Sequence, residues 1–192
     1  MVMIPDSLKQ HCWDDNDWFY ICSLSKAIEA VNRKYICVLK DEKIFHLEHV
    51  FAYELYFKWK GVLSRRGGNP QKLLLNGELI KHYCRMSSFR FPDLVLHKNY
   101  EKKVLNNYQC IICEIKSSRH NISTKALRKD IISLYGGITE LSYKCGVFIF
   151  LGDNTSRMVT RLRKNIQILG IDTEKKIIFM GIDGKKYHYE IL

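Results

Sequence analysis

The sequence lacks any run of eighteen apolar residues, so we expect neither a transmembrane helix nor a membrane partner. Internal repeats and low-complexity segments are also absent, and the first residues do not have the composition of a secretory signal. The seven cysteines are odd in number and irregularly spaced, which argues against a disulfide framework and favours a reducing, cytoplasmic environment. With 192 residues, 46% of them hydrophobic, the chain is expected to form a single domain with a substantial core.

Acidic residues are the minority charge. The chain has 20 Asp and Glu against 31 Lys and Arg, a formal net charge of +11. Such an excess attracts the phosphate backbone of nucleic acid and makes binding depend strongly on salt. Two local groups are candidate phosphate contacts, although a solvated basic surface is the alternative for each. They are Arg65 with Arg66 in a Gly-rich loop, and Lys125 with Lys129, one helical turn apart.

Three charged side chains interrupt two apolar, strand-like runs. Asp93 lies in the first run, 91–97, whereas Glu114 and Lys116 lie in the second. Side chains of a strand alternate between its faces, so Glu114 and Lys116 point the same way. If the polar segment 98–107 is a hairpin loop, the two strands are antiparallel and Asp93 meets Glu114 across the pair. Charged residues are rarely buried unless they are paired or bind a metal, so together the three predict a site.

Two carboxylates beside a lysine are suited to phosphodiester chemistry. Mg²⁺ is commonly held by one or two carboxylates together with water and substrate phosphate, so Asp93 and Glu114 are candidate metal ligands. Lys116 could orient the attacking water or stabilise the negative charge that develops on the phosphate. The alternative from spacing alone is a surface salt bridge between Lys116 and one carboxylate.

Pro92-Asp93, a spacer, and Glu114-Ile115-Lys116 at the end of an apolar strand resemble the motif of the PD-(D/E)XK nuclease superfamily. The resemblance covers roughly residues 44–152. It implies an α/β, restriction-endonuclease-like fold with an αβββαβ core, in which helices flank a mixed central sheet. It also implies a nuclease that depends on Mg²⁺, for which Mn²⁺ can substitute, with DNA favoured over RNA.

Hydrophobic periodicity predicts elements in the order of that core. They are a helix at 44–63, strands at 73–82, 90–97 and 108–117, a helix capped by Ser123 or Thr124 and ended by Gly136-Gly137, and a strand at 144–151. An N-terminal extension, 1–43, is expected to contain a helix over 18–35. The C-terminal segment, 153–192, is expected to form a basic helix near 156–169 and a hairpin of 176–183 and 186–192, turning at Asp183-Gly184.

An additional acid is implied by the resemblance, because a glutamate on the first helix of the superfamily often reaches the metal site. The string Tyr53-Glu54-Leu55-Tyr56 resembles that of a group of uncharacterised bacterial members, so the role is carried over to Glu54. Glu48, on the same helix, and Glu78, in the first strand, are the other candidates. For Glu54 the alternative is a solvated ion pair with Lys58 at the next helical turn.

A second function is compatible with the same residues. Proteins of this fold can bind nucleic acid or serve in assemblies without catalysis, although the three motif residues favour an enzyme here. A homodimer or a protein partner is also left open by the sequence.

Overall fold

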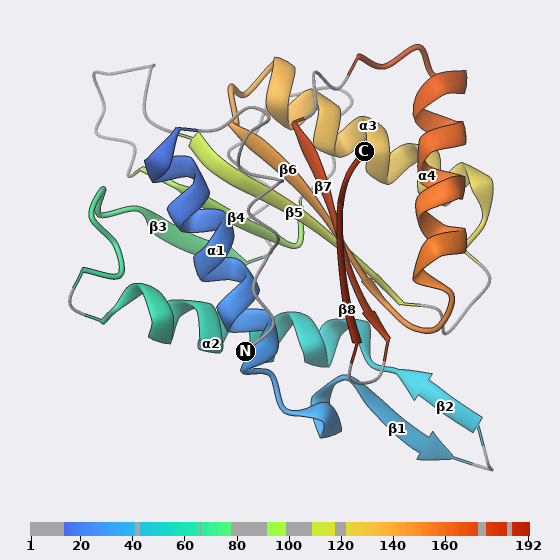
Figure 1. Ribbon diagram of the computed structural model, residues 1–192, viewed down its shortest axis with the longest axis horizontal. Coiled ribbons are helices and arrows are strands. Elements are labelled where there is room, and N and C mark those ends of the chain that lie inside the picture. Colours follow the sequence, from blue (N-terminus) through green and yellow to red (C-terminus); the bar gives the residue numbers. More distant parts are fainter. Residues whose placement is uncertain are drawn as a thin grey trace.

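A computed structural model describes residues 14–40, 43–65, 67–77, 92–98, 109–117, 122–172, 176–183 and 186–192 (Figure 1). These residues form an α/β structure built on a six-stranded mixed sheet. Its helices are α1 (Asp15–Glu29), the short 3₁₀ helix η2 (Arg33–Tyr35), α2 (Glu48–Leu63), α3 (Thr124–Thr139) and α4 (Thr155–Ile168). Its strands are β1 (Cys37–Lys40), β2 (Lys43–His46), β3 (Leu74–Gly77), β4 (Leu94–His97), β5 (Gln109–Ser117), β6 (Cys145–Leu151), β7 (Ile177–Asp183) and β8 (Lys186–Ile191).

The main sheet has the strand order β3-β4-β5-β6-β7-β8. Strands β5, β6 and β7 are parallel, and helices α3 and α4 provide the crossovers between them. The remaining neighbours are antiparallel. Strands β4 and β5 pair as the sequence predicts, with Leu94 opposite Cys113. The segment 98–107 was expected to form their hairpin loop, and all of it except Lys98 lies outside the described residues.

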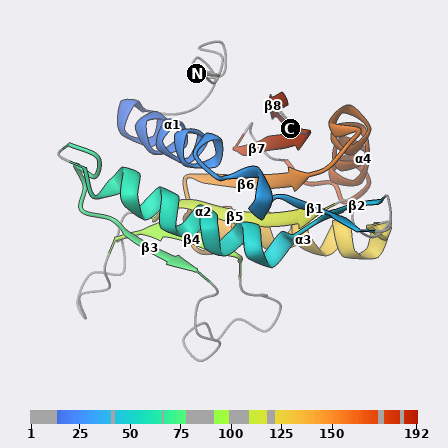
Figure 2. The ribbon, with the colours of Figure 1, turned by 90° about the horizontal axis from the view of Figure 1, so that it is seen from below.

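Helices cover both faces of the sheet (Figure 1, Figure 2). Buried side chains of α1 and α2 pack with one set of sheet residues, including Ile111, Cys113 and Ile115 of β5. Side chains of α3 and α4 pack with the opposite set, including Ile112 of the same strand. Alternation along β5 therefore places Glu114 and Lys116 on the α3 side.

The predicted helix at 44–63 begins later than expected, at Glu48. Residues Lys43–His46 instead form β2, which pairs with β1 in a separate two-stranded sheet. Isoleucine and phenylalanine favour strands as readily as they fit an amphipathic helix, so the local pattern around Ile44 and Phe45 was ambiguous.

Other boundaries also differ from the expected ones. The first helix runs from Asp15 to Glu29 rather than from 18 to 35, and Asp14 caps it by accepting a hydrogen bond from the Asp17 N–H at 2.8 Å. Of the two predicted caps, Ser123 is the one that caps α3, but this helix continues through Gly136 and Gly137 to Thr139. Both glycines are buried, and packing of α3 against the sheet compensates their poor helix propensity.

The C-terminal elements match the predicted helix and hairpin. Strands β7 and β8 are antiparallel, with Asp183 opposite Lys186, and residues 184–185 lie outside the described residues. Of the predicted strand at 73–82, the structure describes β3 and leaves 78–82 outside. Within the described ranges, no helix has the length and apolar character needed to cross a membrane.

Candidate active site

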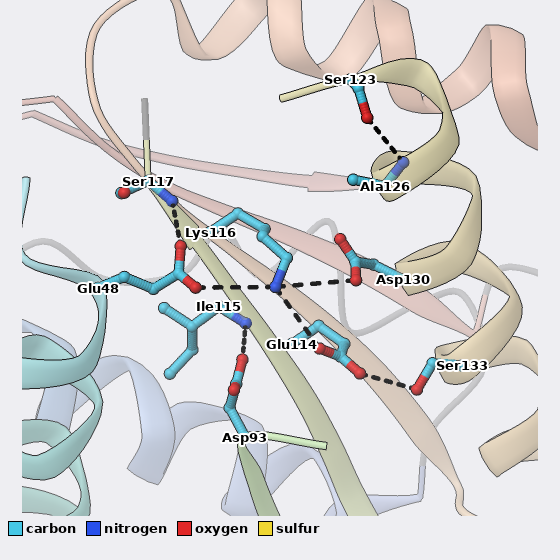
Figure 3. Close-up of polar contacts among 10 residues, drawn as sticks. All are labelled: Glu48, Asp93, Glu114, Ile115, Lys116, Ser117, Ser123, Ala126, Asp130 and Ser133. Atoms are coloured by element: carbon cyan, nitrogen blue, oxygen red, sulfur yellow. Dashed lines mark hydrogen bonds and ion pairs between the residues drawn. The ribbon is translucent and has the colours of Figure 1, made fainter. Parts of the chain in front are cut away.

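The charged residues of β5 lie near its carboxyl end, between the start of α2 and the middle of α3 (Figure 3). Open α/β sheets bind ligands outside the carboxyl ends of their parallel strands, where loops and helix ends leave room for a substrate. Asp93 directly precedes β4, so the antiparallel register with β5 brings it to the same end. This end of β5 is therefore the candidate site.

Glu114 is the most deeply buried acid of the site, with 5% of its surface exposed. The hydroxyl of Ser133, on α3, donates a hydrogen bond to Glu114 Oε1 at 2.7 Å. Burial and the nearby Asp93 carboxylate raise the pKa of Glu114 to about 8, against the lowering effects of Lys116 and Ser133. Burial therefore disfavours the ionised form of Glu114 in the absence of a further cation.

Lys116 lies among acids from three elements (Figure 3). Its Nζ is 3.7 Å from Asp130 Oδ1, 3.8 Å from Glu48 Oε1 and 4.0 Å from Glu114 Oε2. Burial lowers the pKa of Lys116, but the surrounding carboxylates outweigh it and raise the pKa above its ordinary value. The lysine is therefore charged and serves as the cation that these acids share.

Asp93 is positioned by the neighbouring strand. Its Oδ2 accepts a hydrogen bond from the Ile115 N–H at 2.6 Å, and its own N–H donates to the Cys113 carbonyl at 3.0 Å. These bonds extend the ladder between β4 and β5 by one residue. The negative charge of Asp93 also contributes to the raised pKa of Glu114.

The structure brings Glu48, rather than Glu54, into the site. Glu48 Oε2 accepts a hydrogen bond from the Ser117 N–H at 2.9 Å, while Oε1 faces Lys116. Glu54 forms an ion pair with Lys58 at 3.1 Å, which is the alternative considered for it. The two glutamates are six positions apart, or about 9 Å along a helix. The role carried over to Glu54 therefore has no support from its contacts, and Glu48 is the better candidate.

The remaining sequence candidates lie farther away or outside the described residues. Glu78 and the side chain of Arg66 belong to the latter group. Arg65 is exposed just beyond α2, and that helix alone separates it from Glu48 by about 22 Å. Lys125 is exposed and Lys129 half-buried on α3, so contact with phosphate remains a prediction for both.

Two residues of α3 were missed as members of the site, namely Asp130 and Ser133. They are three positions apart and therefore lie on one side of the helix, next to the buried Ile131 and Leu134. The sequence did offer one signal for them, because both are polar residues next to the apolar stripe of this helix. It could not be interpreted without knowing that this side of α3 faces Glu114.

The donor set suits a hard cation such as Mg²⁺. Glu48 and Glu114 each hold one oxygen in a hydrogen bond and direct the other at the ammonium of Lys116. Carboxylate oxygens are the ligands that Mg²⁺ uses, usually one or two of them with water and phosphate. In the described parts of the chain, however, no three Asp, Glu, His or Cys side chains converge as in a formed metal site. The carboxylates of Glu48 and Glu114 are thus chemically suited to Mg²⁺, and the ammonium of Lys116 supplies the positive charge between them.

Comparisons with known proteins add no relative: no family model, no curated protein and no solved structure matches this chain.

Proposed function

We propose that the protein is a Mg²⁺-dependent nuclease that hydrolyses phosphodiester bonds in nucleic acid, with DNA favoured over RNA. The observation that carries the proposal is the position of Lys116, within 4.0 Å of Glu48, Glu114 and Asp130 at the carboxyl end of β5. Asp93 reaches the same end from the neighbouring strand. Acids and a lysine gathered at this place in an α/β sheet match the needs of phosphodiester hydrolysis.

The order of elements also supports the proposal. From α2 to β6 the described residues form a helix, three antiparallel strands, a second helix and a strand parallel to β5. This is the αβββαβ order of the restriction-endonuclease-like core that the motif resembles. A fold by itself does not define an activity, so the chemistry of the site residues is the stronger argument.

Each site residue has a definable part in hydrolysis. Asp93 and Glu114 would hold the metal, with Glu48 as the additional acid. A bound Mg²⁺ supplies Lewis-acid stabilisation of the phosphate and lowers the pKa of water that it contacts. Lys116 then orients the attacking water and stabilises the charge that develops on the phosphate. Ser133 and the Ile115 N–H keep the carboxylates of Glu114 and Asp93 in place.

A non-catalytic nucleic-acid-binding protein is the second candidate. The observation in its favour is that the described residues contain no group of three ligating side chains in a metal-binding arrangement. In that case Lys116 would simply neutralise the acids around it. The net charge of +11 favours a nucleic-acid partner under either function.

The test is a cleavage assay with labelled linear, circular, single-stranded and branched DNA, and with RNA, in Mg²⁺, Mn²⁺ or EDTA. We expect cleavage with either metal and none in EDTA. Lys116→Ala should abolish cleavage and leave binding largely intact. Lys144→Ala is the matched control, because Lys144 is exposed and precedes β6 at the opposite end of the parallel strands.

Two results would change the proposal. Salt-sensitive binding without cleavage of any substrate would favour the non-catalytic protein. Salt-insensitive binding, or none, would remove nucleic acid as the partner.

A further inference from the structure

A pocket of about 470 Å³ lies directly beside the acid cluster. Glu48 and Asp93 contribute to its wall, as do three aromatic residues of α2, Tyr53, Tyr56 and Phe57. Its volume falls within the range of roughly 300–1,000 Å³ that is typical of small-ligand sites. Two carboxylates of the proposed site and a large aromatic surface therefore share one pocket.

The aromatic side of α2 is exposed. Tyr53 is 63% exposed and Phe57, one helical turn further on, is 66% exposed. The opposite side of the same helix buries Phe51, Leu55 and Trp59 in the core. Helix α2 is thus apolar on two sides. One side packs in the core, whereas the side with Tyr53 and Phe57 is exposed. Exposed apolar surface of this kind commonly marks an interaction site.

Positive charge accompanies these aromatic rings. The ammonium of Lys60 lies 5.7 Å from the centre of the Tyr56 ring, and Tyr56 in turn contacts Phe57 edge to face at 5.7 Å. Proteins that bind single-stranded nucleic acid combine basic residues, which follow the backbone, with aromatic rings on which bases stack. Because the surface adjoins the acids proposed to act on phosphate, a nucleotide fits it better than an apolar protein segment.

We infer that this pocket holds an unpaired nucleotide of the substrate, with its base stacked on Tyr53 or Phe57. The inference rests on the proposed function and specifies the substrate class: single-stranded or locally unpaired nucleic acid. Bases inside a duplex are already stacked on their neighbours, so they offer no free face to these rings without first being extruded.

The experiment measures binding in EDTA, where cleavage cannot contribute. A fluorescein-labelled oligo-dT strand and a hairpin duplex of equal length are titrated with wild type, with Tyr53→Ala/Phe57→Ala and with Phe57→Leu. Because the double variant loses the rings on which bases stack, it should bind the single strand about 10-fold or more weakly. Its affinity for the duplex should change less than about 3-fold. Phe57→Leu keeps an apolar side chain but loses the ring, so it should also weaken single-strand binding.

Ile132→Ala provides the matched control, because Ile132 is an exposed apolar residue, at 46%, on α3. It should leave binding of both probes unchanged. As a second readout, 5-iodouracil placed in the single strand should form a photochemical crosslink to Tyr53 or Phe57, identified by mass spectrometry.

Equal weakening for strand and duplex, or full binding by the double variant, would overturn the inference. A wild-type dimer that the same substitutions convert to a monomer would also overturn it, by identifying the surface as a subunit interface. Failure of the proposed function has a different signature. In that case no substrate is cut, yet the preference of the aromatic surface for single strands persists in EDTA.

Discussion

Strands β5 and β6 lie side by side at the centre of the sheet, parallel and in register, yet their side chains differ in kind. Glu114 of β5 is adjacent to Phe148 of β6, and Lys116 is adjacent to Phe150. Strand β6 is entirely buried and carries no charged residue. Strand β5 is almost equally buried but places two charges in the same register.

The difference shows which part of the sheet is explained by stability alone. Phe148 stacks against Phe179 of the next strand, so β6 gains from burial in the usual way. Glu114 instead loses hydration, and this burial is the largest cause of its raised pKa. Replacing buried ion pairs by apolar residues is often neutral or stabilising, so charges at these positions call for a functional explanation.

The largest expected effect comes from making β5 more like β6. Lys116→Met keeps the length of the side chain and removes its charge, and we expect cleavage to fall by about 10²–10³-fold. Lys144→Met should cleave at the wild-type rate. Because the acids around Lys116 lose their shared cation, circular dichroism must show that the variant is folded, and Asp93→Asn repeats the test with the lysine present. Wild-type cleavage by a folded Lys116→Met protein would remove the lysine from the mechanism.

The next effect distinguishes the two glutamates of α2. Glu48→Gln should reduce cleavage by about 10- to 100-fold, because Glu48 faces Lys116 and accepts the Ser117 N–H. Glu54→Gln should stay within about 2-fold of wild type, since Glu54 pairs with Lys58. Single-turnover cleavage rates provide the measurement. The reverse ranking would restore the role first assigned to Glu54.

The pH dependence of cleavage tests the protonation of Glu114. A carboxyl group must lose its proton to bind a metal, and the pKa of Glu114 is raised to about 8. At a fixed, subsaturating Mg²⁺ concentration the rate should rise about tenfold per pH unit below pH 8 and level off above it. More Mg²⁺ should move the midpoint to lower pH. A rate that is flat across this range would show that Glu114 does not control metal binding.

The same group should make stability depend on pH. The ordinary pKa of a glutamate, 4.5, applies to Glu114 in the unfolded chain, whereas folding raises it to about 8. Between these two pH values the folded state therefore holds a proton that the unfolded state has released. The contribution of Glu114 to the free energy of unfolding therefore falls as pH rises through this window, by at most about 1.4 kcal/mol per pH unit. The measurement is the free energy of unfolding in urea at several pH values. The difference between wild type and Glu114→Gln at each pH isolates the contribution of Glu114. A difference that stays constant with pH would contradict the shifted pKa.

The smallest expected effect is a shift of the pH–rate profile that distinguishes Ser133 of α3 from Ser123, the cap of that helix. Ser123→Ala removes the helix cap and Ser133→Ala removes the hydrogen bond to Glu114, each at a cost of about 1 kcal/mol in unfolding free energy. Because the Ser133 hydroxyl lowers the pKa of Glu114, only Ser133→Ala should move the midpoint of the pH–rate profile upwards. Equal midpoints for the two variants would show that Ser133 has a structural role alone.

Much of the sheet could be predicted because its signals are local. The continuous apolar run of β6 predicts a strand buried on both faces, and the polar segment 98–107 predicts the antiparallel pairing of β4 with β5. Side-chain alternation puts Glu114 and Lys116 on one face. The start of α2 could not be predicted as well, because Ile44 and Phe45 suit a strand or a helix. The observed start of α2 also sets the position of Glu48, which is the first residue of the helix.

The amino-acid sequence by itself determined the alternation that pairs Glu114 with Lys116, the burial of β6 and the excess of positive charge. Only the tertiary structure decided that Glu48, Asp130 and Ser133 complete the site and that Tyr53 lines a pocket beside it. The physical reason is distance along the chain. Alternation relates neighbouring residues, whereas Glu48 and the Ser117 N–H are 69 positions apart and meet only because α2 packs against the end of β5.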